Sequence, residues 1–324
     1  MTMFQRVLVT GGAGFIGSHT VDLLLRENKQ VIVLDNLSTG KIENLDLSHP
    51  NLEFVEGDIL EYPLIVDLLA GCDAVLHLAA LSSVPQSIAH PIYSFQVNTQ
   101  GLLHVLQAIQ QRKPALRLVY ASSAAVYGIV KELPCRDEAN IAGNMALSPY
   151  ALQKIHDEDY ATLYRKLYGI NSLGLRYFNV YGLRQDPASP YSGVISRFLS
   201  AYQQNKILTI FGNGQQSRDF IHVSDVARAN VLALQRDDAR DASAANMVGV
   251  EVLNIGTGVP QSLLDLISCM EQIGGRAAQV VHQPARAGDI PSSYAAVARA
   301  EEVMGFHAQL SLLEGMQEMM AAPE

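Results

Sequence analysis

The chain begins with an apolar segment, Arg6–Thr10, that runs directly into a glycine-rich turn. Gly11, Gly14 and Gly17 stand three residues apart in this turn, and an amphipathic segment follows at Gly17–Asn28. Glycine lets the backbone turn tightly, and a helix that begins there points free N–H groups at a bound pyrophosphate. A strand, a glycine turn and a helix in this order therefore predict a dinucleotide-binding βαβ unit.

Short apolar runs alternate with helical segments through the first half of the chain. Each run is almost continuously apolar, as expected for strands that are covered on both faces of a parallel sheet. The expected strands are Arg6–Thr10, Gln30–Asp35, Leu52–Glu56, Ala74–Ala79, Arg117–Ala121 and Ile170–Tyr177, with helical segments that include Gly17–Asn28, Pro91–Arg112 and Pro149–Tyr168. This alternation predicts an α/β fold with a doubly wound parallel sheet of the Rossmann type.

The alternation breaks after Asn179. The expected elements there are a loop at Tyr181–Pro190, a helix at Val194–Gln203, a strand at Leu208–Phe211, a helix from Ser224 to about Gln235, an exposed loop at Asp237–Ala245 and a strand at Val252–Ile255 that returns to the main sheet. We expect a Rossmann domain at 1–179, with return segments at about 220–256, and a smaller, discontinuous α/β substrate lobe at 180–324. The cleft between them is the expected binding site.

Composition excludes several other classes of protein. Hydrophobic residues make up 48% and charged residues 17% of the 324 residues, which is typical of a globular protein. The net charge of −9 without a Lys/Arg cluster disfavours nucleic-acid binding. No signal peptide and no membrane-spanning run are expected. Cys72, Cys135 and Cys269 form no metal spacing and no disulfide framework, which predicts a cytoplasmic protein without a metal site.

The end of the second predicted strand carries an acid that suits a dinucleotide. Asp35 lies 18 residues beyond Gly17, the distance at which a carboxylate can bind the adenosine ribose hydroxyls. A carboxylate there would repel a 2′-phosphate, so NAD is favoured over NADP. The basic residues Lys41 and Arg6 nevertheless leave NADP open as the alternative.

Three further polar residues have open interpretations. Asp58 could meet the adenine edge or simply form a turn or helix cap. His77 lies within a predicted buried strand and is interpreted as a core residue. Asn98 lies within a predicted helix, for which asparagine has a low propensity, so a hydrogen bond to bent backbone near the cofactor and a surface role are both open.

Tyr150 and Lys154 form the most informative pair for chemistry. Ser148 can cap a helix and Pro149 suits its first position, so the pair would share one helix face. A free tyrosine has a pKa near 10, and a nearby ammonium favours its phenolate. Such a tyrosine can move a proton on and off a sugar hydroxyl, although a Y-x-x-x-K spacing also arises by chance.

Together these features resemble the extended short-chain dehydrogenase/reductase family. Four further segments, HLAA at 77–80, YASSAAVYG at 120–128, LRYFNVYG at 175–182 and SRDFIHV at 217–223, are similar to nucleotide-sugar epimerases and dehydratases. Two others, LSSVP at 81–85 and RQDP at 184–187, resemble the bacterial UDP-N-acetylglucosamine 4-epimerases that serve surface-polysaccharide synthesis. The resemblance covers essentially the whole chain.

The resemblance implies a role for each matching residue. Ser123 corresponds to the catalytic serine, Tyr150 to the base, and Lys154 to the lysine that binds the nicotinamide ribose. NAD is the implied cofactor, and its expected contacts are Gly11, Gly14, Phe15, Ile16, Gly17, Asp35, Asn36, Asp58, Ile59, Leu78, Ala79, Ala80, Asn98, Tyr150, Lys154 and Tyr177.

The implied substrate is a UDP-hexose. Its expected contacts are Ser83, Ser123, Tyr150, Asn179, Val194, Arg218, Arg286, Asp289 and Ser293. Arg218 and Arg286 suit a diphosphate because a guanidinium fork forms paired hydrogen bonds, although either arginine alone could belong to a surface ion pair.

The reaction type depends on the residues after Ser123. The dehydratases of this family carry an Asp-Glu pair where this chain has Ala124 and Ala125, and the related decarboxylases also use an acid there. Without an acid, elimination is disfavoured, and the resemblance implies a 4-epimerase in which Tyr150 takes the C4 proton while NAD accepts and returns the hydride.

Substrate choice depends on one position. The resemblance identifies Ser293 as the gatekeeper, where a small residue admits a 2-N-acetyl group and a tyrosine restricts the enzyme to glucose and galactose. Because Tyr294 is adjacent, a UDP-glucose 4-epimerase stays open, and so do a net oxidoreductase and a non-catalytic NAD-binding regulator. The chain departs from the pattern in a long segment at Asn140–Ala146 and in Ala295-Ala296-Val297, where an acid is common. The resemblance also implies a homodimer, because family members usually dimerise through two long helices that correspond to Pro91–Arg112 and Pro149–Tyr168, although the apolar positions of these segments could equally face the sheet as ordinary core.

Overall fold

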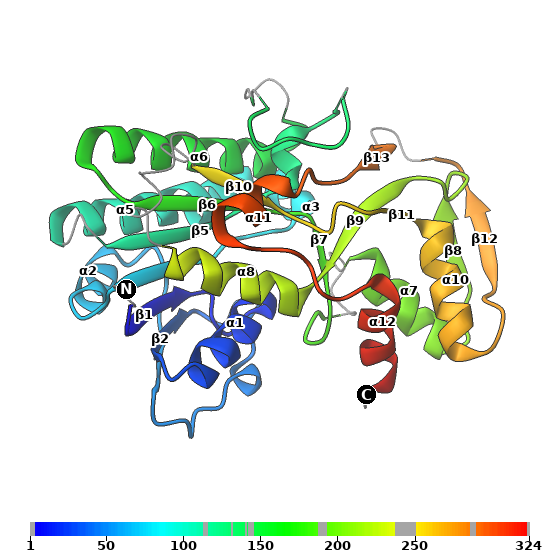
Figure 1. Cartoon of the computed structure of the whole chain (residues 1–324), viewed down its shortest axis with the longest axis horizontal. Helices are drawn as coiled ribbons and strands as arrows, with labels where there is room; N and C mark the ends of the chain where they lie inside the picture. Colours follow the sequence, from blue (N-terminus) through cyan, green and yellow to red (C-terminus); the bar gives the residue numbers. More distant parts are fainter. Residues whose placement is uncertain are drawn as a thin grey trace.

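A single parallel sheet of seven strands forms the centre of the fold (Figure 1). The computed structural model describes residues 4–112, 116–130, 132–139, 141, 146–186, 193–236, 251–285 and 290–322. The strands are β1 (Arg6–Thr10), β2 (Gln30–Asp35), β3 (Leu52–Glu56), β4 (Ala74–His77), β5 (Arg117–Ser123), β6 (Ser172–Tyr177) and β10 (Val252–Ile255). Their order, β10-β6-β5-β4-β1-β2-β3, reverses direction between β1 and β4, so a ligand crevice is expected beyond the carboxyl ends of these two strands.

Helices cover both faces of this sheet, as Figure 1 shows. On one face lie α1 (Phe15–Arg26), α8 (Val223–Gln235) and α11 (Ala298–Met304), and on the other lie α2 (Tyr62–Leu69), α5 (Gly101–Arg112) and α6 (Pro149–Tyr168). Along β1, Val7 and Val9 belong to the first core and Leu8 to the second, because successive strand side chains point to opposite faces. The prediction of a doubly wound α/β sheet is confirmed.

The segment predicted as one helix at Pro91–Arg112 is interrupted. It follows α3 (Val84–Ala89) and consists of α4 (Pro91–Phe95), a π-helical turn at Gln96–Gln100 and then α5. In the described parts of the chain, two short 3₁₀ turns occur elsewhere, at Ile42–Asn44 and Ala124–Tyr127. The wide turn in the middle of a helix marks a place where local packing overrides ideal helix geometry, which is common at functional sites.

A second lobe is built from later parts of the chain. Its strands are β7 (Asn179–Tyr181), β8 (Leu208–Phe211), β9 (Ser217–His222), β11 (Pro260–Ser262), β12 (Val280–Gln283) and β13 (Ser292–Ser293), and its helices are α7 (Val194–Gln203), α10 (Leu263–Gly274) and α12 (Leu312–Ala321). β9 pairs with β11, β13 and β7, and β8 pairs with β12. The buried side chains of α7, α10 and α12 form a core of their own, which lies to one side of the large sheet in Figure 1.

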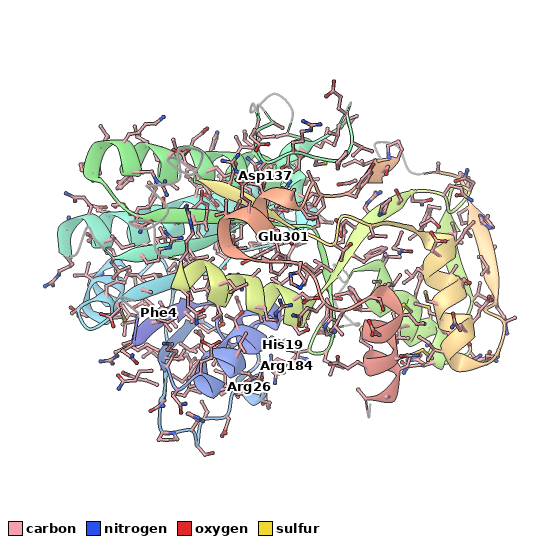
Figure 2. All side chains as sticks on the ribbon, viewed as in Figure 1. Phe4, His19, Arg26, Asp137, Arg184 and Glu301 are labelled. Atoms are coloured by element: carbon pink, nitrogen blue, oxygen red, sulfur yellow. The ribbon has the colours of Figure 1, made fainter. Side chains whose placement is uncertain are left out.

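Contacts along α1 join the two parts. His19 Nε2 lies 3.0 Å from the carbonyl oxygen of Leu183, and Arg184 Nη2 donates to Asp22 Oδ2 at 2.8 Å. In Figure 2, the labelled His19 and Arg184 lie together at this junction. The loop after β7 is thereby held against helix α1 of the Rossmann fold.

Some expectations after Asn179 need correction. The helix at Val194–Gln203, the strand at Leu208–Phe211 and the return of Val252–Ile255 to the main sheet are confirmed. The loop expected at Tyr181–Pro190 begins after Tyr181, because Tyr181 is the last residue of β7, and strand β9 was not predicted. Strands β7 and β9 are short and pair with each other, and the periodicity of a short local sequence does not reveal such pairing. The loop at Asp237–Ala245 lies outside the described residues. Among those described, no helix has both the length and the apolar character needed to cross a membrane.

Candidate active site

The glycine turn leaves no space for side chains. Gly11 has φ +72°, and a Cβ there would lie 2.7 Å from the amide nitrogen of Ala79. A Cβ on Gly17 would lie 2.1 Å from the carbonyl oxygen of Gly11. Gly14 is the N-cap of α1 and provides no capping side chain, so the first amides of the helix, at Phe15 and Ile16, are available to an anion. This cradle fits the pyrophosphate of a dinucleotide.

Asp35 holds the glycine turn from the end of β2. Its Oδ2 accepts from the Ala13 amide at 3.0 Å and its Oδ1 from the Leu37 amide at 2.8 Å. Burial raises the pKa of Asp35, while these two amide donors act in the opposite direction. The carboxylate stands beside the turn, where the ribose of an adenosine would lie if its pyrophosphate occupied the cradle.

Asn36 and Asp58 meet at the same edge of the sheet. Asn36 Nδ2 donates to Asp58 Oδ2 at 2.9 Å, and Asp58 Oδ1 accepts from the Leu60 amide at 2.9 Å. Asp58 thus makes the turn-forming hydrogen bond of its second interpretation, and its contact with the adenine edge stays a prediction. The side chain of Ile59 is buried against Gly101, so its contact with a cofactor would be through the backbone.

His77 is a core residue, as its position in the predicted strand indicated. It is 3% exposed, and its Nδ1 lies 2.8 Å from Thr10 Oγ1. Burial, and to a lesser degree the charge of Lys154, lowers the pKa of His77 to about 3, so the ring is neutral at neutral pH. The backbone of Leu78, Ala79 and Ala80 continues from it beside the glycine turn.

Asn98 connects α6 to the loop after β4. Its Oδ1 accepts from the Leu81 amide at 2.7 Å, and its Nδ2 donates to Gln153 Oε1 at 2.7 Å. The residue is 1% exposed and lies in the π-helical turn, so the surface role is excluded. The same loop places Ser83 at the N-cap of α3, where its hydroxyl oxygen accepts from the Gln86 amide.

Helix α6 begins as predicted. The Ser148 hydroxyl accepts from the Ala151 amide at 3.1 Å, and Pro149 occupies the first turn. Tyr150 is half-buried at this end of the helix, and Lys154 follows one turn later, close enough for an electrostatic interaction with it. Ser123, also half-buried, ends the neighbouring strand β5. The fold therefore brings β5 and the start of α6 together.

Lys154 is held deep in this site. Its side chain is 4% exposed, and Nζ donates to the Ala121 carbonyl at 2.9 Å and to Asp157 Oδ2 at 3.1 Å. Burial acts to lower the pKa of Lys154, but Asp157 and Tyr150 act against it and the net result is a raised pKa. The residue is therefore held as an ammonium at neutral pH, one helical turn from Tyr150.

A buried network of hydrogen bonds connects α6 to strand β6. Arg176 on β6 donates to both carboxylate oxygens of Glu158 and to the Tyr127 hydroxyl. It also donates to the backbone carbonyl of Asp137, the residue labelled near β10 in Figure 2. The hydroxyl of Tyr177, the next residue of β6, donates a hydrogen bond to Asn230 Oδ1 at 2.6 Å. A cofactor could therefore contact the backbone or ring of Tyr177 but not its hydroxyl.

Three predicted substrate residues line one cavity. This cavity has a volume of about 410 Å³ and lies in the second lobe, lined by Asn179, Val194, Arg197, Phe198, Ala201, Ile207, Leu208, Thr209, Phe211, Gln216, Arg218 and Leu263. Its mixture of apolar walls and a few polar groups is typical of a small-molecule site. Arg197 and Gln216 were not predicted, although Arg197 lies one turn after Val194 and Gln216 directly precedes the SRDFIHV segment.

Arg218 and Ser293 are paired across two strands. They are partners in the parallel pairing of β9 with β13, and Arg218 Nη1 donates to the Ile290 carbonyl at 2.7 Å. Ser293 is 8% exposed. Arg286 and Asp289, the other two residues predicted to bind the diphosphate and uridine, lie outside the described residues.

Comparison with known proteins agrees with this geometry. The model of the NAD dependent epimerase/dehydratase family matches residues 7–256. A putative UDP-glucose 4-epimerase of Methanocaldococcus jannaschii is 38% identical, with 97% of each chain covered. A UDP-N-acetylglucosamine 4-epimerase from Methanobrevibacter ruminantium, solved with UDP-N-acetylmuramic acid, has a TM-score of 0.89 at 34% identity, with 99% of each chain covered.

A third relative has the same extent of similarity. The UDP-glucose 4-epimerase of Thermotoga maritima, solved with UDP-glucose, has a TM-score of 0.87 at 34% identity and 97% coverage of both chains. Identity at this level over the whole length goes beyond likeness of fold. The chain therefore belongs to the NAD dependent epimerase/dehydratase family, and its cofactor is NAD.

Proposed function

We propose that the chain interconverts UDP-N-acetylglucosamine and UDP-N-acetylgalactosamine by epimerisation at C4, as a step that supplies polysaccharide synthesis. The broader activity follows from the family and the full-length relatives: the chain is an NAD-dependent nucleotide-sugar 4-epimerase, and thus an isomerase. The single observation that supports the N-acetyl substrate is the small, buried Ser293 at the gatekeeper position, paired with Arg218.

The proposed chemistry assigns one task to each residue around the start of α6. NAD, when bound, accepts a hydride from C4 of the sugar and returns it. Tyr150 removes the C4 hydroxyl proton and later gives it back. Ser123 hydrogen-bonds the same oxygen, and Lys154 holds the nicotinamide ribose and keeps the phenolate charged. No acid follows Ser123 that could eliminate a hydroxyl, because Ala124 and Ala125 stand there.

The cavity is proposed to hold the nucleotide part of the substrate. Asn179 and Arg218 would bind the diphosphate, since amide and guanidinium donors match phosphate oxygens. The apolar walls from Val194 and Phe211 would pack on the base. Ser83, which caps α3 beside the loop after β4, would face the sugar or its acetamido group. These roles also predict that Arg286 and Asp289 complete the site.

Purified protein should convert UDP-N-acetylglucosamine into UDP-N-acetylgalactosamine without added cofactor. We expect retained NAD to be regenerated in each turnover, so the anomeric protons of the product should appear by NMR without NADH release. Conversion of UDP-glucose alone would keep the mechanism and reject the N-acetyl substrate, in agreement with the relatives named UDP-glucose 4-epimerase. Absence of conversion with both sugars would favour a different nucleotide sugar as the substrate, or a non-catalytic NAD-binding regulator.

A Ser293→Tyr variant provides the matched comparison in the same assay. Added bulk at the gatekeeper should lower turnover of UDP-N-acetylglucosamine about tenfold or more while UDP-glucose turnover changes little, because a filled pocket rejects the larger substituent. Equal losses with both sugars would show that Ser293 does not face the 2-substituent. In that case the adjacent Tyr294 would be the gatekeeper to test.

We also propose a homodimer. Large apolar side chains are exposed on α3, α4 and α6, three helices that contact one another: Ile88, Ile92, Tyr93, Phe95, Tyr160, Leu163, Leu167 and Tyr168. Ile92 is 76% exposed and Leu167 is 60% exposed, which is unusual for an apolar surface without a partner. Pairing of these faces between two copies would bury them in a helical bundle.

Light scattering should therefore give twice the chain mass of 35.2 kDa. Ile92→Glu should shift the protein to monomer, because a charge in the middle of an apolar interface loses its water shell. The matched control is Ile207→Glu, which changes a residue that is 59% exposed outside this surface and should leave the dimer intact. Wild-type protein that scatters as 35.2 kDa at micromolar concentration would contradict the proposal. A cytoplasmic location is proposed as well, because Cys72, Cys135 and Cys269 are scattered and odd in number and suggest no disulfide framework.

A further inference from the structure

Asp157 makes the ion pair that fixes Lys154. The two residues are three positions apart on α6, and their side chains are 1% and 4% exposed. An ammonium has three N–H donors. One donates to the Ala121 carbonyl at 2.9 Å and one to Asp157 Oδ2 at 3.1 Å. These two acceptors come from different directions, one from β5 and one from the next turn of α6, so together they fix where the third N–H points.

The Asp157 carboxylate is poorly explained as a structural feature. Its Oδ1 is buried, and the hydroxyl of Thr99, on the π-helical turn, is the neighbour that acts on this carboxylate as a hydrogen-bond donor. The ion pair itself lies within a single helix, and burying both charges often costs more than burying an apolar pair of the same volume. A charge kept under these conditions points to a role other than stability.

A second buried acid, Asp225, shows the contacts that such a residue makes when its role is structural. Asp225 on α8 is equally buried and also pairs with a cation three positions away on the same helix, in this case the later residue Arg228, at 2.5 Å. Both of its carboxylate oxygens, however, accept backbone amides from Gln309 and Leu310, at 3.0 Å in each case. Asp225 therefore ties the segment before α12 to α8, whereas Asp157 contacts a residue of the proposed active site.

We propose that Asp157 is a positioning residue of the epimerase, which holds the Lys154 ammonium so that its third N–H is directed at the nicotinamide ribose. The inference rests on the proposed function, since Lys154 has that partner only in a working NAD site. Asp157 itself touches neither substrate nor cofactor. Its negative charge also keeps Lys154 protonated in a buried position, and a lysine that lost its proton would no longer favour the Tyr150 phenolate.

The other groups around Lys154 define what a pH profile would report. Tyr150, Asp157 and Glu158 interact with it from α6, and His77 from β4. Asp157 is the strongest of the groups that raise the pKa of Lys154, and burial acts against it. Removing the Asp157 charge should therefore let Lys154 lose its proton at a lower pH, and the alkaline limit of kcat should move to lower pH.

The test compares Asp157→Asn with Asp225→Asn. Asparagine keeps the size of the side chain and removes its charge. For Asp157→Asn we expect kcat to fall about tenfold or more with KM nearly unchanged, because a slightly displaced catalytic group lowers turnover rather than binding. Titration calorimetry of NAD into protein stripped of nucleotide should show about tenfold weaker binding, as for a lost charge-assisted hydrogen bond. Asp225→Asn should lower the melting temperature and leave kcat, NAD affinity and the alkaline limit as in wild type.

The inference is overturned if Asp157→Asn keeps kcat and NAD affinity within about twofold of wild type. It is also overturned if Asp225→Asn lowers kcat and NAD affinity as much as Asp157→Asn does. If wild-type protein converts neither UDP-sugar, the proposed function fails, and the NAD titration alone decides the role of Asp157. Asp157→Glu takes over the test if Asp157→Asn does not fold. It keeps the charge but moves the carboxylate by one methylene, so it should preserve the alkaline limit while kcat falls.

Discussion

Tyr150→Phe should lower the kcat of epimerisation by about a thousandfold, because general acid–base catalysis by a positioned side chain contributes about 10²- to 10⁴-fold. Phenylalanine keeps the ring and removes only the hydroxyl that would exchange the C4 proton. The helix should be undisturbed, since the Tyr150 backbone amide donates to Ser87 Oγ and the Ser148 cap is independent of the side chain. KM for the UDP-sugar and NAD content should therefore stay close to wild type.

A neighbouring tyrosine supplies the control for this variant. Tyr160 lies on the same helix but is 37% exposed and ten positions beyond Tyr150. Tyr160→Phe should keep full activity, measured by the NMR assay with equal protein and equal NAD occupancy. If Tyr150→Phe retained more than about a tenth of the wild-type kcat, Tyr150 would not be the general base, because that loss is below the usual contribution of such a group.

Gly17→Ala should abolish retention of NAD through purification. A Cβ at this position would lie 2.1 Å from the Gly11 carbonyl oxygen and 2.8 Å from Gly12 Cα, so the turn must open. Opening it moves the amides at the start of α1 that would bind the pyrophosphate, and we expect NAD affinity to fall about a hundredfold or more. The strain should also cost about 1–3 kcal/mol of folding free energy.

Thermal unfolding with and without NAD separates these two effects. A ligand that binds only the folded state raises its stability by an amount that grows with ligand concentration over Kd, so wild-type protein should melt at a higher temperature with NAD. Gly17→Ala should melt lower than wild type and gain almost nothing from NAD. Gly193→Ala is the control, because its nearest neighbour would lie at an ordinary 3.5 Å and its stability gain from NAD should be unchanged. If NAD raised the melting temperature of Gly17→Ala as much as that of wild type, the glycine turn would not be the site that binds the pyrophosphate of NAD.

Much of the Rossmann sheet can be predicted from the sequence because its strands are buried on both faces. Such strands are continuously apolar, as in Gln30–Asp35, which the structure has with the same bounds. Helix α6 is equally predictable, since Ser148, Pro149 and the terminal Gly169 mark its ends locally. The short strands β7 and β9 are not, because their stability comes from pairing with distant segments rather than from their own composition.

The candidate site also contains features that the sequence predicts and features that it does not. The roles of Ser123, Tyr150 and Lys154 stay predictions from their residue types and from family resemblance, as does the division into domains at residue 179. The interpretation of His77 as a core residue is confirmed, and the surface role for Asn98 is wrong, because Asn98 bonds Leu81 and Gln153 in the interior. Asp157 carried no signal in the sequence, since an acid one turn beyond a lysine is usually a solvated helix pair.

Local chemistry therefore determined the glycine turn, the capped helix with Tyr150 and Lys154, and the alternation of strands and helices in the first half of the chain, because each depends on residues close together in the sequence. Only the tertiary structure placed Asn179, Val194 and Arg218 around one cavity and buried the Lys154–Asp157 pair. Both results depend on contacts between segments that are distant in sequence. Burial, which decides whether a charge pair is incidental or costly, belongs to the packed molecule and not to the order of its residues.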